Sequence, residues 1–174
     1  MCMSLSLISC DKIKEATSKD FKVSGVEFNF TAVSTASTKS ATRAEATQSF
    51  SVTRTVKISE IGSEDVAEYA NKINRVLADN SLINVTVTPA GTYTVENLTI
   101  TAAGVTGSLV VPSYTMGSAF TLPSNTAAFT SAFIMKLVNA RTVSVTVTGM
   151  TDAPEGTTLN ITYESDLIFT ASLL

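Results

Sequence analysis

The sequence contains no histidine and no tryptophan, and its only two cysteines, Cys2 and Cys10, lie within the first ten residues. The rest of the chain therefore cannot form a disulfide, a Cys/His zinc site, a thiol nucleophile or a histidine-dependent triad. Without histidine, no side chain has an ordinary pKa suited to acid–base catalysis near neutral pH. These absences predict a protein that is not an enzyme, with no catalytic residues, no metal site and no cofactor.

Charge is also scarce. Charged residues make up 16% of the chain and the net charge is −3, so the sequence lacks the basic patch that nucleic-acid binding requires, and we expect no nucleic-acid partner. A length of 174 residues suits a single domain with a substantial core. Thr, Ser, Val and Ala dominate the composition. Because β-branched side chains pack well on a pleated surface, this composition predicts a mainly β protein.

The first ten residues end in Leu7-Ile8-Ser9-Cys10, and everything before Cys10 is apolar or small, like the end of a signal-peptide core. This four-residue run resembles the lipobox of bacterial lipoproteins, in the style of Bacteroidota. The resemblance implies cleavage before Cys10 and acylation of its thiol and amine, and several acyl chains on one residue give stable anchoring. The alternative is an ordinary buried cysteine. Neither Lys nor Arg precedes Cys10, so we expect the natural translation start to lie upstream.

The same resemblance divides the chain into three parts. Residues 1–9 are a signal-peptide remnant, residues 10–20 a lipidated tether and residues 21–174 a single β-sandwich domain. The tether is expected because the sequence turns polar directly after Cys10, at Asp11-Lys12-Ile13-Lys14-Glu15.

Alternation of apolar and polar residues predicts the strands. Residues 21–33 alternate with Val26, Phe28, Phe30 and Ala32 on one face. Residues 50–58 alternate as well, but Arg54 falls in phase with the apolar side chains, which indicates either a bulge or an open end of the strand. Residues 34–48 contain no large apolar side chain, and we interpret them as a mobile loop. Further strands are expected at 82–88, 93–103, 109–116, 143–148, 159–163 and 166–174.

Two stretches have helical spacing. Over residues 63–78 the apolar residues form one amphipathic stripe, with Ser63 as the N-cap, acidic residues in the first turn and Asp79-Asn80 as the break. Residues 125–138 are compatible with helix or strand. The sequences of residues 82–88 and 142–148 resemble each other at an offset of 60 residues. The same offset places the helix expected at 63–78 over residues 125–138, which favours a helix there. About eight strands with one or two helical connections predict an antiparallel β-sandwich, immunoglobulin- or transthyretin-like.

The sequence contains two candidate binding groups, one of carboxylates and one of tyrosines. Glu164 and Asp166 share one face of a predicted strand, with Asp152 and Glu155 in the preceding turn, and such carboxylates could hold Ca²⁺ or act as an acid/base pair. No calcium-loop spacing is present, so we interpret them as solvated acids. The tyrosines could form a sugar-stacking platform, but without tryptophan we expect them to pack in the core with the hydroxyl reaching water.

Arg43 lies in the polar loop, with one predicted strand between it and Cys10. The order of lipobox, first strand, exposed arginine and sandwich resembles the fimbrillin pilins of Bacteroidota, although those usually carry two sandwich domains. The resemblance implies cleavage after Arg43, loss of the strand at 21–33 and its replacement by a strand from a neighbouring subunit. Residues 166–174 are the donor that this hypothesis suggests.

From these features we expect an outer-membrane lipoprotein that is held in the cell envelope by its lipid anchor and exposed at the cell surface. Its role would be binding or structural, as an accessory to an outer-membrane uptake complex or in adhesion, with a protein complex, a glycan or like subunits as partners. The alternative is a pilin-like assembly subunit matured at Arg43.

Overall fold

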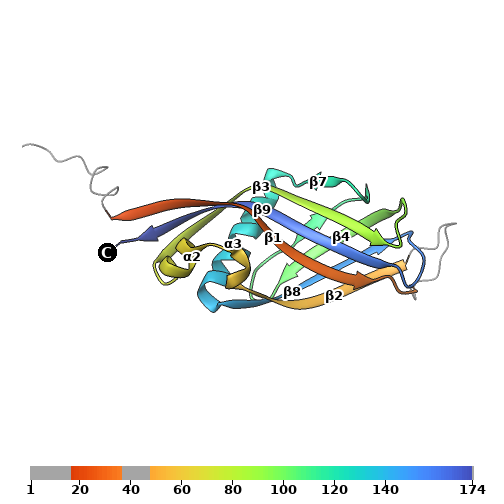
Figure 1. The fold of residues 1–174 in the computed structure, drawn as a ribbon, viewed down its shortest axis with the longest axis horizontal. Coiled ribbons are helices and arrows are strands. Elements are labelled where there is room, and N and C mark those ends of the chain that lie inside the picture. The colour runs from red at the N-terminus through yellow and green to blue at the C-terminus, as the bar shows by residue number, and fades with distance from the viewer. Residues whose placement is uncertain (1–16, 37–47, 174) are drawn as a thin grey trace, which may run out of the picture.

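The computed structural model describes residues 17–36 and 48–173, which fold into two antiparallel sheets packed face to face (Figure 1). The first sheet has the strand order β1-β9-β3-β7, and the second has the order β2-β8-β4-β5 with β6 also paired to β4. This arrangement confirms the predicted antiparallel β-sandwich.

The elements are β1 (Ser18–Val33), β2 (Gln48–Lys57), η1 (Ile58–Ile61), α2 (Glu64–Tyr69), β3 (Ile73–Thr88), β4 (Thr94–Ala102), β5 (Leu109–Val111), β6 (Tyr114–Thr115), β7 (Ala119–Thr121), η2 (Ser124–Thr126), α3 (Ala127–Ala140), β8 (Thr142–Thr151) and β9 (Thr158–Ser172).

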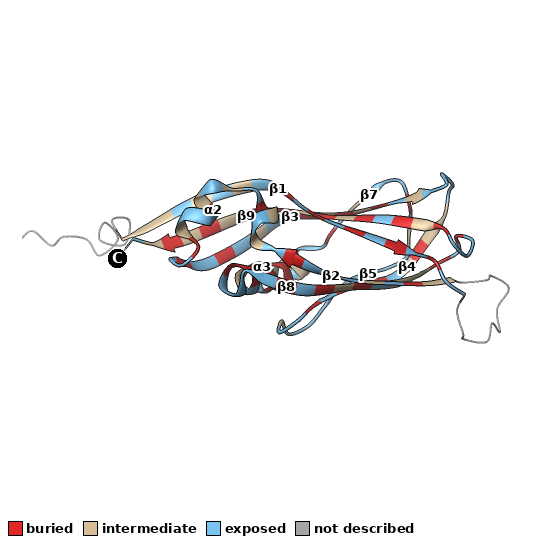
Figure 2. Ribbon diagram, turned by 60° about the horizontal axis from the view of Figure 1, so that its bottom comes forward, coloured by how far each residue is buried: buried red, intermediate tan, exposed pale blue. Residues whose placement is uncertain are grey.

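The alternating pattern of the sequence becomes the burial pattern of the strands. In β1 the four apolar side chains from Val26 to Ala32 are all buried and the residues between them are exposed (Figure 2). The β9 strand is buried at every second position from Leu159 to Ala171. Pro112 directly follows the short edge strand β5, as expected of a residue that cannot donate a ladder hydrogen bond.

The first sheet is longer than the second, and different elements cover its two halves. β1 and β3 each have 16 residues, which corresponds to about 50 Å of strand, whereas β8 has ten. One half of the long sheet packs on the second sheet, and we call it the sandwich half. The other half packs on α3, with α2 beneath β1, and we call it the helix-covered half (Figure 1). Phe28 and Phe133 of α3 meet near the boundary, with ring centroids 5.4 Å apart.

Both outer long strands of the first sheet are irregular at the boundary between these halves. The register of β1 shifts between Val23 and Val26, and that of β3 shifts between Asp79 and Leu82. Gly25 and Asn80 have positive φ angles of 64° and 45° at these bulges. Glycine and asparagine tolerate this left-handed region better than other residues, so these two positions allow the sheet to bend there.

The helix predicted over residues 63–78 is largely wrong. Ser63 does cap a helix, its side chain accepting a hydrogen bond from the Val66 amide, but α2 ends at Tyr69 and β3 begins at Ile73. Beyond the turn, residues 73–79 pair with residues 166–171 of β9. The apolar residues of the stripe are therefore buried as strand residues, because a non-local backbone partner outweighs the local helical period.

The second helix is confirmed as α3, which buries Phe129, Phe133, Ile134 and Leu137 among others. The similarity between residues 82–88 and 142–148 nevertheless does not reflect a structural repeat. The two echoing segments lie in different sheets, in β3 and β8, and the first helix that the offset used is only a short turn of helix. The apolar spacing of residues 125–138 was the sound part of that prediction.

Candidate functional site

Both ends of the described domain lie together at one end of the molecule, which we call the basal end (Figure 1). Ser18 pairs with Ser172, and the Leu173 amide donates to the Thr17 carbonyl at 2.8 Å. The opposite, distal end carries the turns at residues 89–93 and 152–157. The predicted lipidation site Cys10 lies outside the described residues, and the chain that follows it enters the fold at the basal end.

The predicted processing site Arg43 also lies outside the described residues, and its two flanks lie at the distal end. Thr35 and Ser49 form an isolated antiparallel bridge there, with reciprocal backbone hydrogen bonds of 2.8 and 2.9 Å. The segment containing Arg43 therefore connects β1 of one sheet to β2 of the other at the distal end.

The proposed donor strand at residues 166–174 is wrong for the fold in its described form. β9 lies in the interior of the first sheet, paired with β1 along one side and with β3 along the other. It cannot leave without breaking both ladders. Sequence alone could not show this, because strand order is a non-local property.

The four candidate carboxylates are not brought together. Glu164 and Asp166 lie on the outer face of β9 near the middle of the long sheet, whereas Asp152 lies in the distal turn, where it accepts a hydrogen bond from the Thr94 amide at 2.7 Å. Glu155 is exposed in the same turn. Within residues 17–36 and 48–173, no group of three or more His, Cys, Asp or Glu side chains is placed to hold a metal ion.

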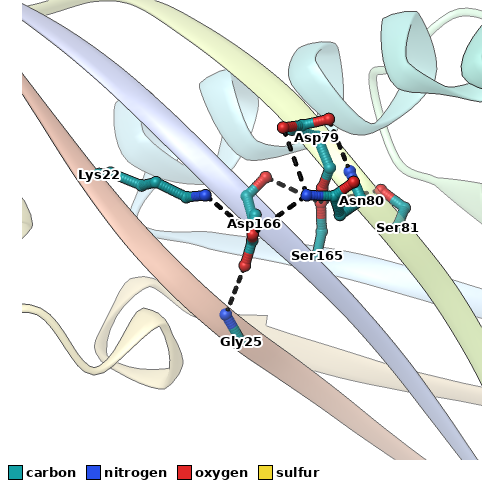
Figure 3. A network of polar contacts seen from close by, with 7 residues as sticks. All are labelled: Lys22, Gly25, Asp79, Asn80, Ser81, Ser165 and Asp166. Carbon is teal, nitrogen blue, oxygen red and sulfur yellow. Dashed lines mark hydrogen bonds and ion pairs between the residues drawn. The ribbon is translucent and has the colours of Figure 1, made fainter.

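Asp166 is instead the centre of a polar network across the bulges (Figure 3). Its carboxylate accepts from the Gly25 amide at 2.9 Å, forms an ion pair with Lys22 at 3.0 Å and accepts from the Asn80 side chain at 3.5 Å. The hydrogen bond from Lys22, followed by that from Gly25, holds the pKa of this carboxyl below its usual value. The network ties three strands together where two of them are irregular.

A second polar network continues beneath the first, inside the core. The hydroxyls of Ser81 and Ser165 lie 2.8 Å apart, and Ser165 also donates to the Asp79 carbonyl. Deeper still, the hydroxyls of Thr130 and Tyr163 lie 2.5 Å apart, which joins α3 to β9. Burial raises the pKa of Tyr163 to about 12, so the phenol stays protonated at physiological pH.

The tyrosines do not form a stacking platform. Tyr163 is buried, Tyr69 packs against Phe21, and Tyr114 packs against Phe120 with centroids 5.4 Å apart. Burial raises the pKa of the Tyr114 phenol. Tyr93 is half-buried against the core. The tyrosines serve packing, as expected, but the hydroxyls of Tyr163 and Tyr114 are buried and do not reach water.

A small pocket of about 190 Å³ lies beside the β3 bulge. Small and polar side chains dominate its lining, together with the backbone of the segment leading into α3; the lining residues are Ala78, Asp79, Asn80, Ser81, Thr121, Leu122, Pro123, Ser124, Thr126 and Ala127. Its volume is below that of pockets that enclose a drug-sized ligand. It therefore offers room for a small polar group rather than for an organic cofactor.

Arg54 lies at the open side of the sandwich, between the edge strands β1 and β2. Its guanidinium sits 5.0 Å from the centroid of the Phe30 ring and pairs with Glu60 at 2.6 Å. The register of β2 against β8 is continuous, so no bulge is involved. Arg54 also lies in the middle of β2 rather than at its end, so neither of the two predicted alternatives is correct; the in-phase arginine is accommodated because β2 is an edge strand of its sheet.

No family model matches the chain, and no curated protein matches it. Among solved structures, a chain from Desmodium yellow mottle tymovirus is similar over 86% of this chain and 89% of that chain, with 13% sequence identity and a TM-score of 0.33. A similarity at this level carries no argument about function. None of the helices in the described residues is long and apolar enough to span a membrane.

Proposed function

We propose that the chain is a lipid-anchored lipoprotein of the bacterial cell envelope, exposed at the cell surface, with a binding or structural rather than a catalytic role. The observation that carries this proposal is the direction of the domain, with both of its ends on one side and a long sheet leading away from them. Its described part begins and ends at the basal end, and the long sheet extends about 50 Å from there to the distal turns.

This direction of the domain suits an anchor at Cys10. Six residues lie between Cys10 and Thr17, so the seven steps from one Cα to the other span at most about 25 Å. The basal end would then face the membrane, and the distal turns would face away from it. Several acyl chains on Cys10 would hold the domain stably in this orientation. The partners consistent with such an orientation are an outer-membrane protein complex, a glycan or further copies of the chain.

The test is the intact mass and the N-terminal residue of the protein purified from its native membrane, expressed from its own locus. We expect a chain that begins with an acylated Cys10 and partitions into detergent. Cys10→Ala is the matched control, and it should stay unprocessed and lose the acyl mass. An unmodified chain that starts at Met1 or upstream would overturn the anchor.

A pilin-like subunit matured at Arg43 is the second candidate, and the position of β1 favours it. Among the described strands β1 pairs only with β9, so it can leave while the other ladders stay intact. Its departure would uncover the core beneath Val26, Phe28, Phe30 and Ala32, and a strand with the same apolar alternation would have to replace it.

This candidate is tested by limited cleavage after Arg43. We expect a new N-terminus at Ala44, release of the first strand and a ladder of oligomers that resist mild denaturation. Arg43→Gln should prevent all three. Cleavage without assembly would exclude the pilin role and leave the anchored binding role in place.

A further inference from the structure

The distal half of β1 presents an open backbone edge. The Ser34 amide donates toward β9, to the Thr157 carbonyl, while the Thr35 amide donates away from it, to Ser49. Because backbone groups alternate along a strand, Glu27, Asn29, Thr31 and Val33 also direct their amides and carbonyls away from β9. β1 has no second neighbouring strand among the described residues, so these four residues form an unpaired edge. Their side chains are all exposed.

The other edges of the sandwich are protected in ways that proteins commonly use against edge pairing. β5, β6 and β7 have only two or three residues each. β2 directs Arg54 inward, and its two ends are tied down, because Ser49 bonds to Thr35 and the Lys57 amide donates to Glu60. From Asn29 to Val33, β1 carries no proline, no bulge and no charge. This open edge is therefore less protected than the edges of β2, β5, β6 and β7.

We propose that two copies of this chain pair through the segment Glu27–Val33, antiparallel and centred on Phe30. This register places Glu27 opposite the partner copy's Val33 and Asn29 opposite its Thr31. All four open residues of each copy then exchange backbone hydrogen bonds, two for each opposed pair. No like charges face each other directly, because Glu27 is the only charged residue in the segment.

The antiparallel arrangement follows from symmetry. Two identical edges form a closed pair through a two-fold axis. An axis perpendicular to the sheet gives antiparallel strands and keeps both apolar faces on the same side. An axis along the strands would give parallel pairing but would turn the polar outer face of one copy to the apolar side of the other. Only the first arrangement continues the sandwich.

The orientation of this pair has a functional consequence, which rests on the proposed anchor at Cys10. β1 runs from the basal end toward the distal end, so antiparallel pairing points the two basal ends in opposite directions. The overlap involves only the distal half of β1. Two copies anchored in one membrane cannot meet this way, whereas copies on two facing membranes can. The pairing therefore makes the protein a homophilic adhesion module that links surfaces.

The first experiment measures self-association of the full 174-residue chain in solution, without lipid and under reducing conditions, by sedimentation velocity across a concentration series. We expect a reversible dimer. Thr31→Pro removes an outward amide but leaves the backbone hydrogen bonds to β9 intact, losing only the long side-chain bond of 3.4 Å to Asn160. It should weaken the dimer about tenfold or more. Thr53→Pro removes an outward amide from the edge of β2, and as the matched control it should leave the dimer unchanged.

Thr31→Lys provides a second variant that keeps the backbone amide and adds charge to the edge, and it should also weaken the dimer. A wild-type chain that stays monomeric at its highest soluble concentration would overturn the proposal. Equal weakening by Thr53→Pro would overturn the choice of edge. Circular dichroism melts establish that each variant is folded.

The second experiment uses phospholipid vesicles that carry the chain acylated at Cys10. We expect light scattering to show clustering of wild-type vesicles, no clustering with Thr31→Pro, and inhibition by soluble wild-type chain. Dimers in solution without vesicle clustering would overturn pairing between membranes. A failure of lipidation is distinguishable, because it would abolish vesicle loading while leaving the solution dimer intact.

Discussion

The two halves of the long sheet use different cores. In the sandwich half, apolar residues of β1, β9 and β3 meet a second sheet whose inner face is equally regular. In the helix-covered half, the same three strands meet α3 and the short α2. Between them lies the polar seam of Asp166, Ser165 and Tyr163, with bulges on either side. The comparison shows how one set of strands can serve two packing partners if polar contacts stabilise the transition.

The substitutions with the largest expected effect on stability test whether the two halves fold as one unit. Ile161→Ala opens a cavity in the sandwich half and Leu137→Ala opens one in the helix-covered half; both residues are fully buried. Each should lower the free energy of unfolding by about 2–5 kcal/mol. Because three strands run through both halves, urea denaturation followed by far- and near-UV circular dichroism should show one coincident transition in each variant. Separate transitions would show that the seam divides two independent units.

Tyr163→Phe tests the buried part of the seam. It removes the hydroxyl bonded to Thr130 and leaves the buried threonine hydroxyl with only its longer bond of 3.3 Å to the Thr126 carbonyl. We expect a loss of about 1 kcal/mol in the free energy of unfolding, because a buried hydroxyl loses its shorter hydrogen bond. Thr130→Val restores a matched apolar pair, so the double variant should be more stable than Tyr163→Phe alone. A double variant whose loss of stability equals the sum of the two single losses would contradict this coupling between the two hydroxyls.

Asp166 provides the exposed part of the seam and a pH signature. Its pKa in the folded chain lies below the unfolded value of about 3.9, so its contribution to stability is present above that value and is lost as the pH falls through the folded pKa. Asp166→Asn should therefore be less stable than wild type at pH 7, and the difference should disappear at low pH. Denaturation curves between pH 7 and pH 2.5 measure this.

Lys22→Met is the matched control for that experiment, because Lys22 forms the ion pair with Asp166. It should reduce stability in the wild-type background and have little further effect in Asp166→Asn. Equal effects of Lys22→Met in both backgrounds would show that the ion pair does not account for the pH dependence.

The comparison of the halves also explains what the sequence could predict. Strands β1 and β2 and helix α3 were predictable because their apolar periods agree with the way they are buried. Residues 73–78 were wrongly predicted as helix because the strand residues that pair with them lie almost a hundred positions later, in β9. The Asp166 site could be predicted only in part. The acid could be singled out, but its partners Lys22, Gly25 and Asn80 come from two other strands that are distant in the sequence. The open edge of β1 was not visible, since an edge is defined by which strands are absent beside it.

The smallest expected effect concerns the first turn of the wrongly predicted helix, which was predicted correctly. Ser63 accepts a hydrogen bond from the Val66 amide at 3.3 Å, and Glu64 and Asp65 lie in the first turn of α2. Ser63→Ala should lower the free energy of unfolding by about 0.5–1 kcal/mol, and Ser63→Asp should restore it. Because α2 is short and lies at the border of the helix-covered half, the loss should appear in hydrogen exchange of α2 before it appears in β9. Protection lost equally in both elements would mean that even this short helix belongs to the cooperative core.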